Sequence, residues 1–421
     1  MNLLPIIIFI TSYLLFILLP KRRSLVAVLA GALLILTRCI SWREAFLAVN
    51  WNVLGIFVGT LILADSFMAS RVPAVLAEII VDKSRNTCWA ILWLCFFTGF
   101  ISAFVENVAT VLIVAPVALS LARKIKLNPV NMMIAIAVTS NLQGAATLIG
   151  DPPSMLLAGF ARLNFIDFFF YRARPSIFFA VELGAVASFL VLFFIFRKEK
   201  DKVKLVAVEK VISWFPTVLL ITLIILLALS SLFDPEFKGL AGIICLFIGI
   251  VSLLADRLIQ KKAIIHSLRS LDWDTTFFLL GVFVLVGGLT ISGWINVLAK
   301  SIAHLVGGNK FSAYTFLVFI SVVISAFVDN VPFLAAMLPV ALKLSGQLNL
   351  EPTLLLFGLL IGVSLGGNIT PIGASANIVS CGLLKKEGYQ VSFRDFSRIG
   401  IPFTLAAVTV AYIFIWIVWS K

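Results

Sequence analysis

Two acidic dipeptides, Glu106-Asn107 and Asp329-Asn330, stand inside long apolar stretches of the chain. Each belongs to a segment that the chain contains twice. Residues from 101 onward recur from 324 onward with a constant offset of 223 and no gap, giving 20 identities over about 60 positions. We therefore expect the chemistry to lie in these paired segments.

An acid and an amide within a hydrocarbon-length run are tolerated only if they are buried in protein or face water. Burial in low-dielectric surroundings raises the pKa of a carboxylate, and a bound cation lowers it, so the group releases its proton when the cation binds. That competition is the physical basis of cation–proton exchange, so Glu106 and Asp329 are candidate ion-binding residues, together with Asn107, Asn330 and Thr110. The alternative, that the two acids cap the N-termini of short helices, would still place them at the same site.

Each copy also contains an apolar stretch interrupted by Gly, Asn, Thr and Pro, at 139–154 and at 364–377. Gly and Pro at this density break a helix and free backbone carbonyl and N–H groups, which must find polar partners in a membrane. Side-chain and carbonyl oxygens form a hard oxygen site suited to Na⁺, and the N-terminus of a half-helix attracts an anion. The predicted ligands here are Asn141, Gly144, Thr147, Asp151, Gly367, Asn368, Thr370, Ser375 and Asn377, with Na⁺ expected at Asn107, Asn141, Asn330 and Asn368. Close helix packing through small residues would explain Gly366-Gly367 alone, but not Asp151, Asn368 and Asn377 in the same places.

The composition indicates what must position these residues. The chain has 421 residues, of which 61% are hydrophobic and 13% charged, and its mean hydropathy is +1.12. Apolar runs of about twenty residues predict a polytopic helical membrane protein rather than a β-barrel. The net charge is +13, and the Lys and Arg residues that produce it lie in short loops between these runs. Orientation in a membrane explains this distribution, so we expect the protein to contact lipid rather than nucleic acid.

The fold class expected is an all-α polytopic membrane protein with two inverted five-span repeats, each with a re-entrant hairpin and a broken transmembrane helix. The first repeat is predicted at 1–196, a cytoplasmic linker at 197–210 and the second repeat at 211–421. In the first repeat we expect spans at 3–19, 24–40, 50–69 and 175–196, a short helix at 71–83, a hairpin at 88–122 and a broken span at 130–160. The second should hold spans at 211–232, 239–256, 274–292 and 398–420, a short helix at 294–306, a hairpin at 311–345 and a broken span at 352–382.

The hairpins are expected because 88–122 has too many apolar residues for one helix and carries Glu106-Asn107 at its middle. A full span bent at Pro116 is the alternative. With hairpins, each half crosses the membrane five times, so the second copy must be inverted. An orientation with both termini outside puts 23 of the 33 Lys and Arg residues in inside loops, as the positive-inside rule requires.

The paired motifs resemble the ion transporter superfamily. The stretches from Glu106 to Pro116, from Ser140 to Ser154 and from Ser364 to Asn377 are similar to the branch with arsenical-pump membrane proteins, D-type sodium/proton antiporters and the melanosomal P protein. The resemblance implies a scaffold half and a moving transport half, with the hairpin tips and unwound loops forming the site, and a homodimer. This chain departs from the branch at Ser154, where Asn is usual, and at Gln143 and Ile369, where Gly is usual.

The function expected is secondary active transport by alternating access in the cell membrane, driven by Na⁺ or H⁺, with cation–proton exchange of a small inorganic ion favoured. A carrier of arsenite or of a small carboxylate is the close alternative. A third hypothesis is the membrane subunit of an ATP-driven pump. The chain has no Walker A sequence, so such a pump would need a separate ATPase. No enzyme constellation is found and no cofactor is expected beyond the coupling ion.

Overall fold

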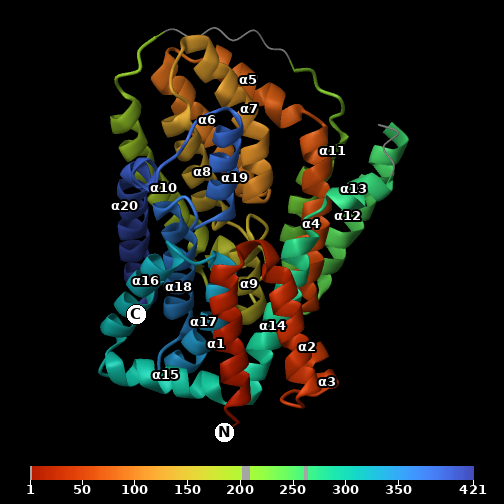
Figure 1. Ribbon diagram of the computed structural model, residues 1–421, viewed down its shortest axis with the longest axis vertical. Helices are drawn as coiled ribbons and strands as arrows, with labels where there is room; N and C mark the ends of the chain where they lie inside the picture. Colours follow the sequence, from red (N-terminus) through yellow and green to blue (C-terminus); the bar gives the residue numbers. More distant parts are fainter. Residues whose placement is uncertain (1, 202–208, 260–263) are drawn as a thin grey trace.

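The computed structural model describes residues 2–201, 209–259 and 264–421, and helices make up most of them (Figure 1). Within these residues, eight helices are long and apolar enough to cross a membrane. A chain surrounded by lipid must pair its backbone groups inside each segment, which is why the apolar runs become helices. The predicted polytopic helical fold is confirmed.

The first half contains ten α-helices, two short 3₁₀ turns and one two-stranded hairpin among its described residues. The α-helices are α1 (Leu4–Leu18), α2 (Arg23–Leu36), α3 (Trp42–Ala48), α4 (Trp51–Ala69), α5 (Val72–Asp82), α6 (Thr87–Ser102), α7 (Asn107–Ile125), α8 (Val130–Gly144), α9 (Pro152–Ala161) and α10 (Ile177–Phe196). The turns are η1 (Pro20–Arg22) and η2 (Ile166–Phe168), and the antiparallel strands β1 (Phe170–Tyr171) and β2 (Arg174–Pro175) follow α9.

The second half contains ten further α-helices and one 3₁₀ turn among its described residues. They are α11 (Phe215–Phe233), α12 (Leu240–Ile259), α13 (Ile264–Ser270), α14 (Trp273–Ile291), α15 (Trp294–Leu305), α16 (Lys310–Ser325), α17 (Asn330–Gln347), α18 (Pro352–Gly366), η3 (Gly367–Ile369), α19 (Ser375–Lys386) and α20 (Phe393–Trp419).

The two hairpins form as predicted. α6 and α7 are separated by residues 103–106, and α16 and α17 by residues 326–329. In Figure 1 the first hairpin lies in the upper part of the molecule with α5, and the second lies in the lower part with α15. The two repeats are therefore inverted with respect to each other. The hairpin arms are 16 to 19 residues long, and α7 continues beyond the predicted end at 122 through Arg123 and Lys124 to Ile125.

The broken helices also form at the predicted places. α8 ends at Gly144 and α9 begins at Pro152, whereas α18 ends at Gly366 and α19 begins at Ser375. Every residue of α18 from Thr353 to Gly366 is buried. A helix that is apolar on all faces is stable only inside a bundle, so α8 and α18 form the centre of the structure.

The first two helices are shorter than the spans expected at 3–19 and 24–40. α1 has 15 residues and α2 has 14, and they are bent by 117° at the break between them. At 1.5 Å per residue each covers about 22 Å, less than the roughly 30 Å hydrocarbon core. The expectation that each is a full-length span is wrong, since the basic turn Pro20–Arg22 ends α1 early.

The boundaries of the two repeats remain predictions. Of the linker predicted at 197–210, residues 202–208 lie outside the described residues, as do residues 260–263, between α12 and α13. At the end of the linker, Glu209 pairs with Arg71 at 2.7 Å, which ties this segment to the start of α5.

α4 packs along α12, and α2 packs along α14. The first contact is close because Gly55 and Gly59 on α4 face Gly242 and Cys245 on α12. Small residues let helix backbones approach in a membrane, where packing replaces the hydrophobic effect as the driving force. Because α1 also packs on α2 and α14, α11 on α4 and α12, and α14 on α4, these six helices form one group. The hairpins and broken helices lie beside it.

Gly59→Ala is expected to destabilise the protein, because its Cβ would collide with the carbonyl group of Cys245. Overpacking of this kind costs about 1–3 kcal/mol. The measurement is the melting temperature of purified protein in detergent, followed by tryptophan fluorescence. Gly346→Ala is the matched control, since nothing lies within 4 Å of a Cβ there; an equal loss in both variants would contradict the packing argument.

Candidate functional site

The tips of the two hairpins and the gaps in the two broken helices meet around one cavity of about 50 Å³. A buried water needs roughly 10–15 Å³ by this measure, so the cavity has room for a few waters or a small ion. Its polar lining residues are Arg23, Glu106, Asn107, Asn141, Asp151, Asp272, Thr275, Asp329, Asn330 and Ser375.

Glu106 is the N-cap of α7 at the first hairpin tip. Its Oε2 accepts a hydrogen bond from the Ala109 N–H at 3.0 Å. The side chain is half-buried and lies near Asp151 and Asp272. The capping role considered from the sequence is therefore real, and the carboxylate lines the cavity as well.

A chain of buried amides connects the first tip to both broken helices. Asn107 donates to Asn141 Oδ1 at 3.3 Å, and Asn141 donates to Asn368 Oδ1 at 3.0 Å and to the Ser364 carbonyl at 2.8 Å. Ser102 on α6 donates to Asn107 Oδ1 at 2.7 Å. The end of α8 is thus bonded to the end of α18, so the two repeats share one polar centre.

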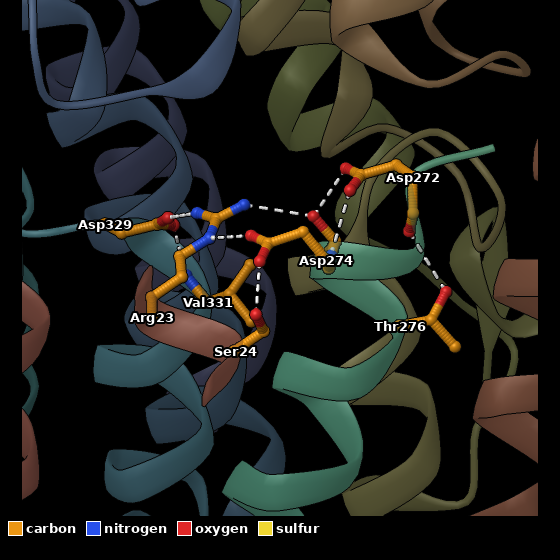
Figure 2. A network of polar contacts seen from close by, with 8 residues as sticks. Arg23, Ser24, Asp272, Asp274, Thr276, Asp329 and Val331 are labelled. Atoms are coloured by element: carbon orange, nitrogen blue, oxygen red, sulfur yellow. Dashed lines mark hydrogen bonds and ion pairs between the residues drawn. The ribbon is translucent and has the colours of Figure 1, made fainter. Parts of the chain in front are cut away.

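Asp329 occupies the position of Glu106 in the second hairpin and caps α17 through the Val331 N–H at 3.2 Å. Its second oxygen accepts from Arg23 Nη1, as Figure 2 shows. Arg23 Nε also lies 3.3 Å from Asp274 Oδ2, and Arg23 Nη2 donates to Thr275 Oγ1 at 3.0 Å. The charge of Asp329 is thus balanced by a guanidinium, whereas Glu106 has no such partner among the described residues that line the cavity.

The unwound loops are held by matching hydrogen bonds in the two repeats. Thr147 donates to the Ala103 carbonyl, and Thr370, 223 residues later, donates to the Ala326 carbonyl. Ser154 donates to the Gly144 carbonyl at 3.3 Å. Asn377, at the position equivalent to Ser154, donates to the Gly367 carbonyl at 2.9 Å. Side chains of the protein therefore satisfy several carbonyls that the sequence suggested as ion ligands.

The glycines at the breaks are required by close approach rather than by an unusual backbone conformation. A Cβ on Gly144 would overlap the amide of Asn107, and one on Gly367 would come within 2.9 Å of Asn330 Oδ1. Each hairpin tip therefore rests directly on the backbone of a broken helix. Gly144 and Gly367 serve as contact surfaces for the tips.

Asp151 is the N-cap of α9, with Oδ1 accepting from the Ser154 N–H at 2.9 Å. It is 1% exposed, and its Oδ2 has no hydrogen-bond partner among the described residues. An ionised carboxylate buried in this way is costly unless a proton or a cation accompanies it. The equivalent residue in the second repeat is Ala374, so α19 begins with no side-chain cap at the cavity.

The structure brings half of the predicted ligands to the cavity. Those that line it are Glu106, Asn107, Asn141, Asp151, Asp329, Asn330 and Ser375. Those that do not line it are Thr110, Gly144, Thr147, Gly367, Asn368, Thr370 and Asn377, which lie behind it or hold its walls. Thr110 differs most from expectation, because its hydroxyl donates to the Glu106 carbonyl one turn back at 3.2 Å. Of the four Na⁺ positions predicted, three line the cavity and Asn368 does not.

Three polar lining residues were not singled out from the sequence: Arg23, Asp272 and Thr275. Arg23 was assigned to an inside loop because it follows Lys21 and Arg22. Asp272 caps α14 through the Thr275 N–H at 2.9 Å. An Asp placed three residues before a Thr at the start of an apolar run is a helix-start signal, but that pattern alone does not place the start at the site.

The comparisons with known proteins agree with this architecture. The model of the family described as citrate transporter matches residues 13–333 and 263–421, which together span nearly the whole chain. The chain belongs to this citrate transporter family. The transporter Rv2684 of Mycobacterium tuberculosis, described as uncharacterized, is 28% identical over 430 residues, covering 99% of this chain and 98% of that protein. The mouse P protein is 26% identical over 454 residues, covering 89% of this chain and 54% of that protein.

Two solved structures share the fold. The YdaH transporter of Alcanivorax borkumensis matches with a TM-score of 0.61 at 16% identity, covering 86% of this chain and 84% of that one. MtrF of Neisseria gonorrhoeae, which belongs to a class of antimetabolite efflux pumps, matches with a TM-score of 0.59 at 17% identity, covering 93% and 86%. Membership of the citrate transporter family, together with the apolar helices, makes this protein a multi-pass membrane transporter.

Proposed function

We propose that this member of the citrate transporter family is a secondary active transporter that exchanges a small inorganic cation for protons by alternating access. The observation that carries the proposal is the charge of the cavity. Four carboxylates line it, those of Glu106, Asp151, Asp272 and Asp329, against the single guanidinium of Arg23 among the described residues. A site with this excess of acids favours a cation or protons over an anion.

The acids of the first repeat are the proposed sites of exchange. Among the described residues, one buried oxygen of Asp151 has no hydrogen-bond partner, and Glu106 lies nearby with its Oε2 accepting from the Ala109 N–H. A proton on either group and a cation between them are alternative ways to balance the same charge. Oxygens of Asn107, Asn141 and Asn330 at the cavity wall supply neutral ligands of the kind that Na⁺ accepts.

The inverted hairpins support the proposal of alternating access. One tip approaches the cavity from each end of the molecule (Figure 1), and each tip rests on a glycine of a broken helix. Withdrawal of one tip would open the cavity to one side while the other tip keeps it closed. We further propose a location in the cell membrane with both termini outside, on the basis of the Lys and Arg residues in loops other than the turn before Arg23, which lies at the cavity.

The second candidate is a Na⁺-coupled carrier of a small carboxylate. It is favoured by the presence of Arg23 at the cavity and by the uncapped N-terminus of α19, where Ala374 stands in place of an acid. Guanidinium groups and helix N-termini both bind carboxylates. The family description points in the same direction.

A substrate panel in liposomes tests the proposal. Purified protein would be reconstituted without ATP, and uptake of labelled Na⁺, citrate and arsenite would be measured under imposed Na⁺ and pH gradients. Exchange of Na⁺ or Li⁺ against protons supports the proposal. Citrate or arsenite uptake without cation–proton exchange would overturn it in favour of the alternatives. Absence of flux with every substrate until an ATPase partner is added would identify a pump subunit.

A further inference from the structure

We propose that Arg23 is an internal counter-ion that occupies Asp329 while no substrate cation is bound, and that a substrate cation must displace it. The inference deepens the proposed cation exchange and rests on it. It also makes the two equivalent acids, Glu106 and Asp329, unequal partners in transport.

The guanidinium of Arg23 is held on several sides. Besides Asp329 and Asp274, it binds Thr275 and lies 5.2 Å from the centre of the Phe278 ring, all on α14 except Asp329. Ser24, the next residue, donates to Asp274. Arginine is suited to this arrangement because its planar fork donates in fixed directions, so the group remains in place facing Asp329.

The pair also joins two parts of the structure. Arg23 begins α2, which packs along α14, whereas Asp329 begins the second arm of the second hairpin. A second bond supports the same attachment, since Tyr13 on α1 donates to the Pro332 carbonyl at 2.5 Å. The first turn of α17 is therefore fastened to α1 and α2 by both its cap residue and its backbone.

A cation held at Glu106 and Asp151 shares the cavity with Asp329, so it can also bind Asp329 in competition with Arg23. The side chains of Arg23 and Asp329 are 19% and 29% exposed, and both line the cavity. A cation that binds Asp329 balances the charge of the carboxylate, so the carboxylate no longer attracts the guanidinium. Cation binding is thereby linked to release of the second hairpin tip. A ligand can drive such a movement only if it interacts more favourably with one conformation than with the other, and competition with Arg23 provides that difference.

Na⁺ binding to purified protein tests the competition. Tryptophan fluorescence would be followed during titration with NaCl against choline chloride at constant ionic strength. Arg23→Gln is expected to lower the apparent Kd for Na⁺ about 10-fold, equivalent to about 1.4 kcal/mol. Arg22→Gln is the matched control, because Arg22 is an exposed residue of the same turn, and it should leave the Kd unchanged.

The double variant shows whether the effect passes through Asp329. Asp329→Asn removes the carboxylate for which both cations compete, so Arg23→Gln should give no further gain in that background. A 10-fold gain that persists with Asn at position 329, or an unchanged Kd in R23Q, would overturn the proposal.

A second experiment measures amide hydrogen exchange in the absence of any substrate ion. Loss of the guanidinium should raise exchange in the peptide covering residues 326–338 by about 10-fold or more. R22Q should not change it, and R23K, which keeps the charge, should retain part of the protection. If wild-type protein binds neither Na⁺ nor Li⁺ while R23Q loosens this peptide, the proposed cation function fails but the attachment stands. Unchanged exchange in R23Q would refute the attachment itself.

Discussion

Replacement of Glu106 by Gln is expected to reduce coupled ion flux to background while the protein inserts and folds. The Gln side chain keeps an oxygen that can accept the Ala109 N–H, so the cap of α7 survives. What is lost is a negative charge at the cavity. Because this side chain is half-buried, its loss is compared with that of a bond to a charged group, about 1.5–3 kcal/mol, which should weaken cation binding about 10- to 100-fold.

The measurement is flux of the transported cation in liposomes, with insertion checked by gel filtration in detergent. Glu236→Gln is the control, since Glu236 is an exposed acid of the loop between α11 and α12 that pairs only with the neighbouring Lys238 among the described residues. Glu106→Asp, which keeps the charge, should retain part of the activity. Normal coupled flux in E106Q would show that the site has been assigned to the wrong acid.

Asp151→Asn is the second change with a large expected effect. The Asn oxygen can still accept the Ser154 N–H, so α9 keeps its cap. The Oδ2 atom, which has no hydrogen-bond partner among the described residues, is replaced by an amide nitrogen, so the side chain can no longer ionise or attract a cation. We expect loss of coupled flux with little change in the melting temperature.

Asp151→Ala separates the two roles of this residue. It should also abolish flux, but in addition lower stability by about 1 kcal/mol through loss of the cap. If D151N transported normally and D151A did not, the cap alone would explain the residue. Its buried charge would then have no part in transport.

The sequence was sufficient to predict the inverted hairpins and the broken helices. The repeat at an offset of 223 placed Glu106 and Asp329 at equivalent tips, and in the structure both cap the second arm of a hairpin. Gly144 and Gly367 were expected at the breaks, and both lie there. Helix caps and helix breakers are determined by residues adjacent in the sequence, so their positions in the structure can be predicted from the sequence.

Contacts between distant residues could not be predicted in this way. Arg23 and Asp329 are 306 residues apart, and the basic run around Arg23 has the composition of an ordinary inside loop. The short lengths of α1 and α2 could not be predicted either, because the apolar runs that contain them are as long as those of full spans. Thr110 lies on the same arm as Glu106 but does not line the cavity, because a Thr in a helix can bond its own backbone, which spacing alone does not reveal.

Sodium-driven proton movement tests the central claim most directly. Liposomes containing the protein would be loaded with NaCl and a pH-sensitive dye, then diluted into choline chloride without ATP. The account predicts that Na⁺ leaves, protons enter and the lumen acidifies, that external Na⁺ reverses the signal, and that E106Q abolishes it. No pH change with either Na⁺ or Li⁺ in wild-type protein, or an equal change in E106Q, would contradict the account.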